Sequence, residues 1–281
     1  MSFPAIPRER RHTLYFLREI RRFSPVFLDT EIDMSSVTEY RRQAKADGQR
    51  ISVITCVVHA AGRVLARHPD ANAAIRGGLS AKIARFTGAD AKITLDKRIN
   101  GQRVVLSTVL KGVHEAGLAE IQSGVDRFRD GDPETMPEFA GARKLHRLPP
   151  WLGRTLFAFA VRPLEVRAAR FGTFAVTSLG HRPVDSFHSV GGTTVTIGLG
   201  RVTDRPVVRD GRVVIAPVMR LSLAFDHRVI DGAEAADVLA ELKQSLEGFT
   251  PAPPPPRGRA DRRTSDLAAL PEAGPEKQES R

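Results

Sequence analysis

The sequence predicts an α/β protein with a mixed β-sheet, because helical and strand-like patterns alternate along the chain and some neighbouring strands are joined by tight turns. Asn100-Gly101 and Asp210-Gly211 each lie between two runs rich in β-branched residues, which is the signature of a two-residue hairpin. Hairpins join antiparallel strands, so the sheet is not purely parallel. With 281 residues and 41% hydrophobic content, the chain can bury a sizeable core.

The first part of the chain predicts helices on either side of one strand. Residues 8–22 form a helical pattern that ends before Ser24-Pro25, because a residue before proline avoids the helical region. Residues 26–32 then alternate like a strand. We expect Ser35 and Ser36 to cap a helix that ends near residue 46. Residues 52–67 place apolar side chains on one helical face, which indicates a core helix.

The remainder adds strands, two amphipathic helices and one apolar helix. Short strand-like runs occupy residues 80–110, and Leu118 to Phe128 has helical spacing. An apolar helical run at Trp151 to Val161 is too short to cross a bilayer. Further strands are expected at 172–178, 193–202, 206–209 and 213–225, followed by a helix at 234–246.

We expect residues 1–249 to form one domain and residues 250–281 to form a disordered tail. After Gly248 the composition changes to a proline run at residues 251–256 and then to a mixed-charge stretch with few large apolar residues. Such a composition cannot bury enough apolar surface to fold.

The net charge of +11 is concentrated in two segments. Residues 1–24 have six arginines against two glutamates, and residues 143–182 have eight basic residues against Glu165, so the two balances of +4 and +7 account for the whole excess. A surface of this kind attracts a nucleotide cofactor, nucleic acid or an anionic membrane face. The alternative is a solvated basic face that only maintains solubility. We expect no nucleic-acid binding, because no recognised motif or aromatic platform accompanies the charge.

The cysteine content and the N-terminal residues exclude several classes of protein. Cys56 is the only cysteine, which excludes an internal disulfide and a thiolate zinc cage, and we expect no metal site. The charged start of the chain has no apolar core or cleavage site, and no stretch has the length of a spanning helix. We therefore expect a cytoplasmic protein, with peripheral membrane contact as the only membrane association.

The motif that points most directly to a function is Asp226-His227-Arg228-Val229-Ile230-Asp231-Gly232, between a strand-like and a helix-like run. A histidine at the end of a strand can take a proton from a nucleophile near neutral pH. Asp231 can fix the imidazole or the local fold, and Gly232 permits a tight turn or the close approach of a ligand. The alternative for three such positions is a purely structural loop. A second pair, Cys56 and His59, lies three residues apart on one helix and could act covalently, although a packed small thiol is the simpler interpretation.

Several stretches, in order, resemble the catalytic domain of the dihydrolipoamide acyltransferases of 2-oxo-acid dehydrogenase complexes, relatives of chloramphenicol acetyltransferase. The resemblance spans roughly residues 8–247. The stretches are Thr30-Glu31-Ile32-Asp33, Ile51-Ser52-Val53 through His68-Pro69-Asp70-Ala71-Asn72, Gly117-Leu118-Ala119-Glu120-Ile121, Gly172-Thr173-Phe174-Ala175-Val176-Thr177-Ser178-Leu179-Gly180, and Asp226-His227-Arg228 with Asp231-Gly232.

The resemblance implies a chloramphenicol acetyltransferase-like two-layer sandwich and coenzyme A-dependent acyl transfer to a thiol or another acceptor, without a covalent enzyme intermediate. His227 would be the general base. A hydroxyl in the strand before a Leu-Gly pair would stabilise the oxyanion; Thr177 occupies that position, and a shift of one residue would give the role to Ser178, on the opposite face of the strand. Ser178 and Gly232 are then expected to lie against coenzyme A.

Further expectations follow from the resemblance. Asp231 would be a structural carboxylate paired with Arg10 or Arg11, and Arg228 would brace the histidine loop. Active sites would lie between the subunits of a homotrimer. No lipoyl or subunit-binding domain precedes the first helix, so we expect the acceptor on a separate lipoyl or acyl-carrier chain, or as a free molecule. An extra helical segment at about 147–170 could cover the acyl site, bind a partner or touch a membrane, or simply dock on the surface. The alternative function is a non-catalytic assembly subunit of a 2-oxo-acid dehydrogenase-type complex.

Overall fold

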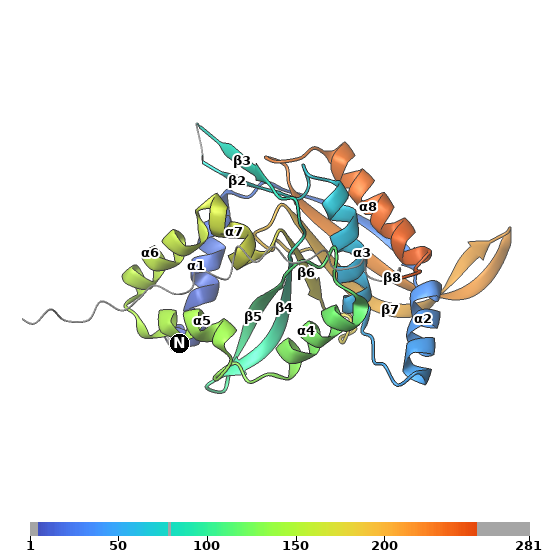
Figure 1. Cartoon of the computed structure of the whole chain (residues 1–281), viewed down its shortest axis with the longest axis horizontal. Coiled ribbons are helices and arrows are strands. Elements are labelled where there is room, and N and C mark those ends of the chain that lie inside the picture. The colour runs from blue at the N-terminus through green and yellow to red at the C-terminus, as the bar shows by residue number, and fades with distance from the viewer. Residues whose placement is uncertain (1–4, 78–79, 252–281) are drawn as a thin grey trace, which may run out of the picture.

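A six-stranded mixed sheet, in the order β1-β8-β7-β6-β4-β5, organises the computed structural model, which describes residues 5–77 and 80–251 (Figure 1). A separate two-stranded sheet pairs β2 with β3. The strands are β1 (Pro25–Asp33), β2 (Ala73–Arg76), β3 (Lys82–Arg85), β4 (Ala91–Ile99), β5 (Gln102–Leu110), β6 (Phe174–Ser178), β7 (Val195–Arg209) and β8 (Arg212–Asp226). The observed class confirms the predicted α/β fold with a mixed sheet.

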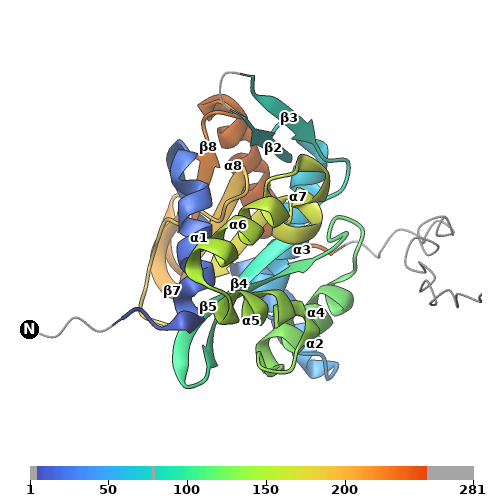
Figure 2. The same ribbon diagram turned by 90° about the vertical axis from the view of Figure 1, so that its left-hand side faces the viewer.

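The helices form two groups. One group packs over one face of the sheet and completes the core, and the other lies beside the edge strand β5 (Figures 1 and 2). The first group is α2 (Ser35–Ala46), α3 (Val53–Arg67), α4 (Leu118–Asp130) and α8 (Gly232–Glu247). The second is η1 (Arg8–Arg10), α1 (Arg11–Glu19), η2 (Ile20–Arg22), η3 (Pro137–Phe139), α5 (Ala140–Arg147), α6 (Pro150–Val161) and α7 (Leu164–Phe171).

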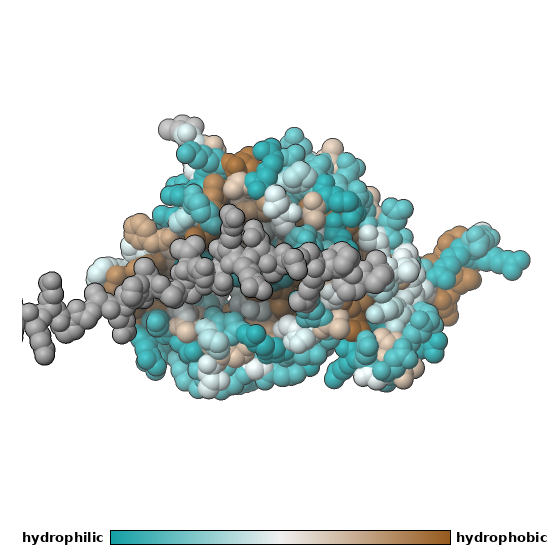
Figure 3. Space-filling model, viewed as in Figure 1, coloured by the Kyte–Doolittle hydropathy of each residue, from teal (hydrophilic) through white to brown (hydrophobic). Residues whose placement is uncertain are grey.

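The two predicted hairpins are confirmed, and their geometry explains the residues that form them. Asn100 and Gly101 have φ angles of 49° and 76°, and Asp210 and Gly211 have φ angles of 51° and 74°. Two successive positive φ angles define the turn whose twist matches that of the flanking strands, and aspartate, asparagine and glycine tolerate this conformation best. The second turn joins β7 to β8, which together project from the body and expose apolar side chains (Figure 3).

Two local expectations are wrong. The strands expected at 193–202 and 206–209 form one strand, β7; Pro206 lies beyond the part that pairs with β6, so its missing N–H interrupts no central ladder. Ser35 and Ser36 do not cap α2: the Asp33 carboxylate accepts from the Ser35 N–H at 3.0 Å, whereas Ser36 donates to the carbonyl of Glu247 at 2.5 Å. Asp33 satisfies a free N–H of the first turn instead.

A buried lysine fixes the second helical group to the sheet. Lys92, on β4, is 6% exposed, and its Nζ donates to the Gly191 carbonyl at 3.0 Å. The ammonium lies 4.4 Å from the ring centre of Phe16 on α1 and 4.5 Å from that of Phe171 on α7. Burial, followed by the charge of Arg167, lowers the pKa of Lys92 to about 7. The two aromatic faces and one carbonyl therefore offset only part of the loss of water around the ammonium.

Two histidines hold α5 against α1. His12 Nε2 lies 3.1 Å from the carbonyl oxygen of Val105 on β5, so this nitrogen carries the hydrogen of the neutral ring. His12 Nδ1 then accepts from His146 Nε2, 2.9 Å away. Burial, followed by the neighbouring His12, lowers the pKa of His146 to about 4, and burial also lowers the pKa of His12. Both rings are therefore neutral at pH 7, which their hydrogen bonds require.

Acid should destabilise the protein through this histidine pair. In the unfolded chain these rings take up protons near their ordinary pKa of 6.5, whereas folded His146 stays neutral until about pH 4. The unfolded state therefore binds more protons between these limits, and the free energy of unfolding should fall as the pH drops from 6.5 to 4. Urea unfolding at a series of pH values measures this. His146→Gln keeps an N–H donor but no titrating ring, so its stability should fall less steeply, while exposed His181→Gln should follow the wild type. A slope unchanged in His146→Gln would contradict the assignment.

A matched pair of helix glycines tests the packing of the core. A Cβ at Gly62, in α3, would lie 2.8 Å from a Val113 side-chain carbon and 3.0 Å from its backbone carbon, whereas a Cβ at Gly141, in α5, would meet nothing within 4 Å. We expect Gly62→Ala to lower the free energy of unfolding by about 1–3 kcal/mol through overpacking. Gly141→Ala should raise it by up to about 1 kcal/mol, because alanine favours the helix. Urea unfolding of both variants measures these changes. An equal change in the free energy of unfolding of the two variants would contradict the prediction.

Candidate functional site

His227 lies in a tight turn directly after β8. Its N–H donates to the Ser24 carbonyl at 2.9 Å, which ties the turn to the chain before β1. Its Nδ1 lies 3.3 Å from Oδ1 of Asp231, and the two side chains are 46% and 89% exposed. The imidazole is thus oriented on one side by a carboxylate and open to solvent on the other. This arrangement suits a general base that receives its substrate from outside the chain.

The turn is held by Asp226, a residue to which the sequence alone assigned no role. Its carboxylate is 4% exposed and binds the Arg228 guanidinium, with Oδ1 at 2.9 Å from Nε and Oδ2 at 2.5 Å from Nη2. It also accepts from the Ser24 N–H at 3.3 Å and the Arg228 N–H at 3.2 Å. Arg228 therefore braces the loop, as expected. The signal for Asp226 was its place at the end of an otherwise apolar strand.

Asp231 contacts His227 within the described chain, rather than the predicted Arg10 or Arg11. Arg11 instead donates to the carbonyls of His146 and Leu148 at 3.2 and 2.9 Å. The extra helical segment supplies these acceptors, which explains why Arg11 is already occupied. The predicted ion pair between Asp231 and Arg10 or Arg11 is therefore not found within the described residues of one chain.

Gly232 begins α8 directly after Asp231. Its φ is not positive, so the tight turn suggested for it does not explain the glycine. A Cβ at this position would meet nothing within 4 Å, so the glycine leaves open space beside the histidine loop. This is compatible with the alternative reason for a glycine there, the close approach of a ligand.

His68, at the C-terminal end of α3, holds α8, the helix that follows the histidine loop. His68 Nδ1 lies 2.9 Å from Glu234, and its Nε2 lies 3.1 Å from Glu241, both on α8. Burial acts against the charged ring, but the hydrogen bonds and charges of the two glutamates prevail and raise the pKa of His68. This histidine therefore links α3 to α8.

Thr177 and Ser178 lie on opposite faces of β6, as predicted. Val176 belongs to the helix-covered core, so Thr177 points to the other face, where its Oγ1 is 2.7 Å from Oγ1 of Thr94. Ser178 faces the helices, and its Oγ accepts from the Gly180 N–H at 3.3 Å. Because a hydroxyl has both donor and acceptor capacity, Thr94 can accept from Thr177 or leave the Thr177 hydrogen free for a substrate oxygen.

One chain does not bring Thr177 and His227 together. Thr177 pairs with Gly198 on β7, and Gly198 pairs with Ser222 on β8, whereas His227 lies five residues beyond Ser222. At about 3.3 Å per residue, this offset is roughly 16 Å along the sheet, with two further strand spacings of about 4.8 Å across it. Since β6 and β8 run in opposite directions, Thr177 lies at the end of β6 that points away from His227.

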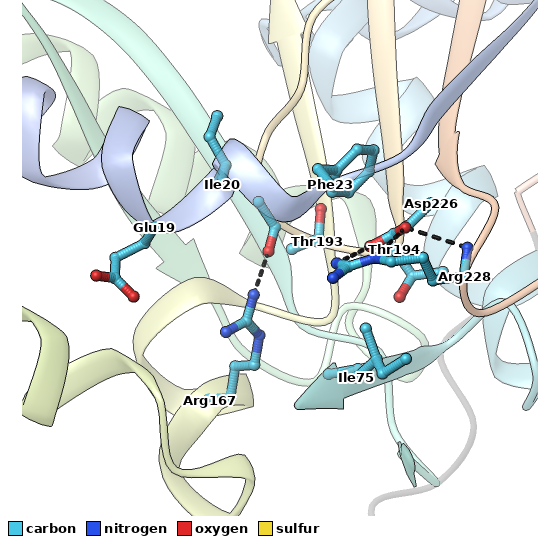
Figure 4. A pocket seen from close by; sticks show the side chains of 11 residues that line it. Glu19, Ile20, Phe23, Ile75, Arg167, Thr193, Thr194, Asp226 and Arg228 are labelled. Carbon is cyan, nitrogen blue, oxygen red and sulfur yellow. Dashed lines mark hydrogen bonds and ion pairs between the residues drawn. The ribbon is translucent and has the colours of Figure 1, made fainter. Parts of the chain in front are cut away.

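A small cavity adjoins the histidine loop (Figure 4). Its volume of about 30 Å³ is too small for a thioester and its acceptor. Arg167, from the extra segment, points into this region and donates to the Gly192 carbonyl at 2.8 Å. Burial, followed by the charge of Arg228, lowers the pKa of Arg167. The cavity is lined by Glu19, Ile20, Phe23, Ala74, Ile75, Arg167, Gly192, Thr193, Thr194, Asp226 and Arg228. His227 does not line it.

An open cationic hollow of about 440 Å³ lies near Thr177 instead. Asp96, two residues beyond Thr94 on β4, and Arg182, four residues after β6, both line it. Asp96 is paired with Arg103 at 2.6 Å. The other two lining residues, Lys97 and Arg98, are basic, so the hollow suits a ligand with several negative charges.

The second pair singled out in the sequence is not suited to catalysis. Cys56 is fully buried in α3, and burial raises the pKa of its thiol to about 12. Burial, followed by the charge of Arg63, lowers the pKa of His59 to about 4. A thiol without access or thiolate character is a packed core residue.

Two aspartates in the same loop provide a matched test of what holds it. Asp226→Asn should lower the free energy of unfolding by about 1–3 kcal/mol, because it leaves a half-buried guanidinium without its counter-charge. Asp231→Asn should change the stability by less than about 0.5 kcal/mol, because Asp231 is exposed. Urea unfolding measures both. Asp226→Asn combined with Arg228→Met should recover part of the loss. If Asp231→Asn were the more damaging change, the roles assigned to the two carboxylates would be reversed.

Comparison with known proteins shows which family this chain is similar to. Residues 162–252, which include Thr177 and His227, match the catalytic domain of the 2-oxoacid dehydrogenases acyltransferases. A dihydrolipoyllysine-residue succinyltransferase component of the 2-oxoglutarate dehydrogenase complex from Azotobacter vinelandii is 29% identical over 226 residues, 77% of this chain and 48% of that protein. The acetyltransferase component of the pyruvate dehydrogenase complex from Bacillus subtilis is 52% identical over 50 residues, 18% of this chain and 11% of that protein.

Solved structures agree in fold. A probable dihydrolipoamide acetyltransferase from Listeria monocytogenes matches with a TM-score of 0.65 at 18% identity, over 89% of this chain and 95% of that one. The cubic core of a pyruvate dehydrogenase multienzyme complex matches with a TM-score of 0.64 at 20% identity, over 88% and 91%. The curated relatives that match most of this chain are about twice as long as the matched part, so the chain spans about half of their length. The chain is thus similar to the 2-oxo-acid dehydrogenase acyltransferases: it has the fold of their catalytic domain, and residues 162–252 match that domain.

Proposed function

We propose that the protein is a coenzyme A-dependent acyltransferase in which His227 is the general base. The observation that carries the proposal is the exposed imidazole, held beside Asp231 by a rigid turn at the end of β8. A thiol pKa near 8.5 and an imidazole pKa near 6.5 differ by about two units, so proton transfer from an attacking thiol costs little in the transition state. No covalent enzyme intermediate is needed.

Thr177 is the proposed oxyanion donor. Attack on a thioester places negative charge on the carbonyl oxygen, and a hydroxyl already aimed at that oxygen stabilises the transition state. Thr94 supports this role because it holds the Thr177 hydroxyl at 2.7 Å and so restricts its orientation. The methyl group of threonine further limits the rotamers of the side chain.

The active site is proposed to lie between two copies of the chain. Thr177 is separated from His227 by two strands and by five residues along the sheet, so the two side chains cannot form one site in the same copy. A trimer in which the His227 end of one copy meets the Thr177 end of the next would create three equivalent sites by rotation. Each site would then enclose its substrates only after assembly.

Coenzyme A and a dihydrolipoyl thiol are the proposed substrates. The cationic hollow near Thr177 supports coenzyme A, since phosphate groups would be attracted by its basic residues. The names of the relatives describe acyl transfer to dihydrolipoyllysine residues, which supports a dithiol acceptor carried on a lipoyl-bearing chain. A solved structure with 21% identity was determined to examine a serine, a histidine and an asparagine in such a mechanism; there the histidine and asparagine are four residues apart, as are His227 and Asp231.

Mixing two inactive variants tests both the residues and the site between copies. His227→Ala and Thr177→Val should each reduce acyl-coenzyme A turnover with a dihydrolipoamide acceptor by about 10²–10⁴-fold while the fold remains intact. Unfolding and refolding the two variants together should restore about a quarter of the wild-type rate, since a quarter of randomly formed interfaces would pair both native residues. Free-thiol release measures the rate.

Two controls make this test specific. Thr177→Ser should keep most of the activity because it retains the hydroxyl, and Ser178→Ala should be nearly silent because its side chain faces the helices. No recovery in the mixture, although size analysis shows mixed oligomers, would contradict a site between copies. Full activity of His227→Ala would contradict the mechanism itself. Absence of turnover in the wild type, with co-purification of dehydrogenase subunits, would favour the non-catalytic assembly function.

A further inference from the structure

Helix α6 exposes two large aromatic side chains that an ordinary surface helix would bury. Its buried residues are Gly153, Ala158 and Val161, whereas Trp151 and Phe159 are 68% and 74% exposed. A helix that only docks on a domain buries its largest apolar side chains. The small residues of α6 permit close packing on the body, where Phe157 also packs, whereas Trp151, Leu156 and Phe159 are exposed. The outer side therefore has a use other than core formation.

Helix α1 continues this apolar surface. Tyr15 of α1 packs against Phe157 of α6 with ring centres 6.2 Å apart, and a Cβ at Gly153 would lie only 2.9 Å from the Tyr15 hydroxyl. Figure 2 shows the two helices side by side on the same side of the molecule. The exposed apolar residues of α1 and α6 are Leu14, Leu17, Trp151, Leu156 and Phe159, which we call the apolar face. Hydrophobic colouring is visible over α6 in Figure 3.

Basic residues lie on the elements that form and adjoin the apolar face, and Glu165 on α7 is an exposed carboxylate nearby. The elements η1, α1, η2, α5 and α6 contain only two carboxylates; Glu9 is buried, and Glu19 binds Arg162 at 2.8 Å. Exposed cations on the same elements include Arg10, Arg18, Arg21, Lys144, Arg147 and Arg154. Any partner that covers this surface must therefore supply negative charge together with an apolar interior.

We propose that the apolar face and its basic surroundings bind the surface of an anionic phospholipid bilayer. Such a surface combines acyl chains, which accept Trp151, Phe159 and the leucines, with phosphate headgroups, which attract the arginines. Nucleic acid would match the charge but not the aliphatic residues. A second copy of the same face would meet its own positive charge. Among the described residues, no helix is long and apolar enough to cross a membrane, so the contact is peripheral.

Trp151 reports on the contact directly, because it is the only tryptophan in the chain. We expect the emission of the full-length protein to shift to shorter wavelength with vesicles of phosphatidylcholine containing about 30% phosphatidylglycerol, as the indole leaves water. Pure phosphatidylcholine vesicles should produce little shift. Sedimentation with the vesicles gives the affinity, which should fall with added salt because the headgroup attraction is screened.

Matched variants separate the apolar and basic contributions. Phe159→Ala keeps the reporter and should weaken binding to the anionic vesicles by about fivefold or more, whereas Ile215→Ala, which trims an equally exposed side chain on the β7–β8 hairpin, should not. Arg18→Glu with Arg154→Glu should weaken binding by more than about tenfold. Arg76→Glu with Arg212→Glu makes the same change in net charge at exposed positions on β2 and β8 and should have a much smaller effect.

Three results would overturn the proposal. One is equal loss of binding in both charge-reversed double variants, which would indicate attraction by net charge alone. Another is equal binding to pure phosphatidylcholine. The third is a Trp151 emission that changes with protein concentration or with a nucleic acid duplex but not with vesicles, which would assign the face to a second copy or to nucleic acid. Acyl transfer is measured separately, so failure of the membrane contact leaves the proposed enzyme activity untouched.

Discussion

The buried carboxylate of Asp226 is the constraint on which the geometry of the site depends. It joins the end of β8, the guanidinium of Arg228 and the backbone of Ser24, which lies 202 residues earlier in the chain. A buried carboxylate needs such partners, because an unpaired charge at this depth is strongly destabilising. The turn that satisfies Asp226 also directs the next residue, His227, away from the core. An electrostatic requirement of the fold thus sets the orientation of the candidate base.

The order of the strands then decides where that base can act. β6 is parallel to β7, and β8 is antiparallel to β7, so β6 and β8 run in opposite directions. The end of β6 that bears Thr177 therefore lies far from His227 at the end of β8. The cavity beside the histidine loop holds only about 30 Å³, and His227 does not line it. Both facts favour a chemistry that is completed by another copy of the chain. Assembly would then be a condition for activity rather than an addition to it.

The extra helical segment changes the surroundings of the sheet in two ways. Its α7 supplies Phe171, which packs against Lys92, and Arg167, which lines the small cavity, so part of the segment is integrated with the body. Its α6 instead buries small residues and exposes aromatic ones beside many arginines. The two basic stretches of the sequence, at the N-terminus and in this segment, meet through contacts such as Arg162 with Glu19 and His12 with His146. Two basic stretches that are far apart in the sequence therefore lie together at one end of the molecule.

The sequence by itself determined the elements whose signals are local. The Asn100-Gly101 and Asp210-Gly211 turns, the periodic helices and the short motif around His227 depend on interactions between residues close in the chain, and all are found where expected. Only the tertiary structure decided which groups meet across long separations: Asp226 with Ser24, Arg11 with the carbonyls of α5, and Thr177 with Thr94. It also decided that Thr177 and His227 do not meet within one copy. Strand order and the burial of polar groups are set by the packing of the whole core, and no local pattern contains that information.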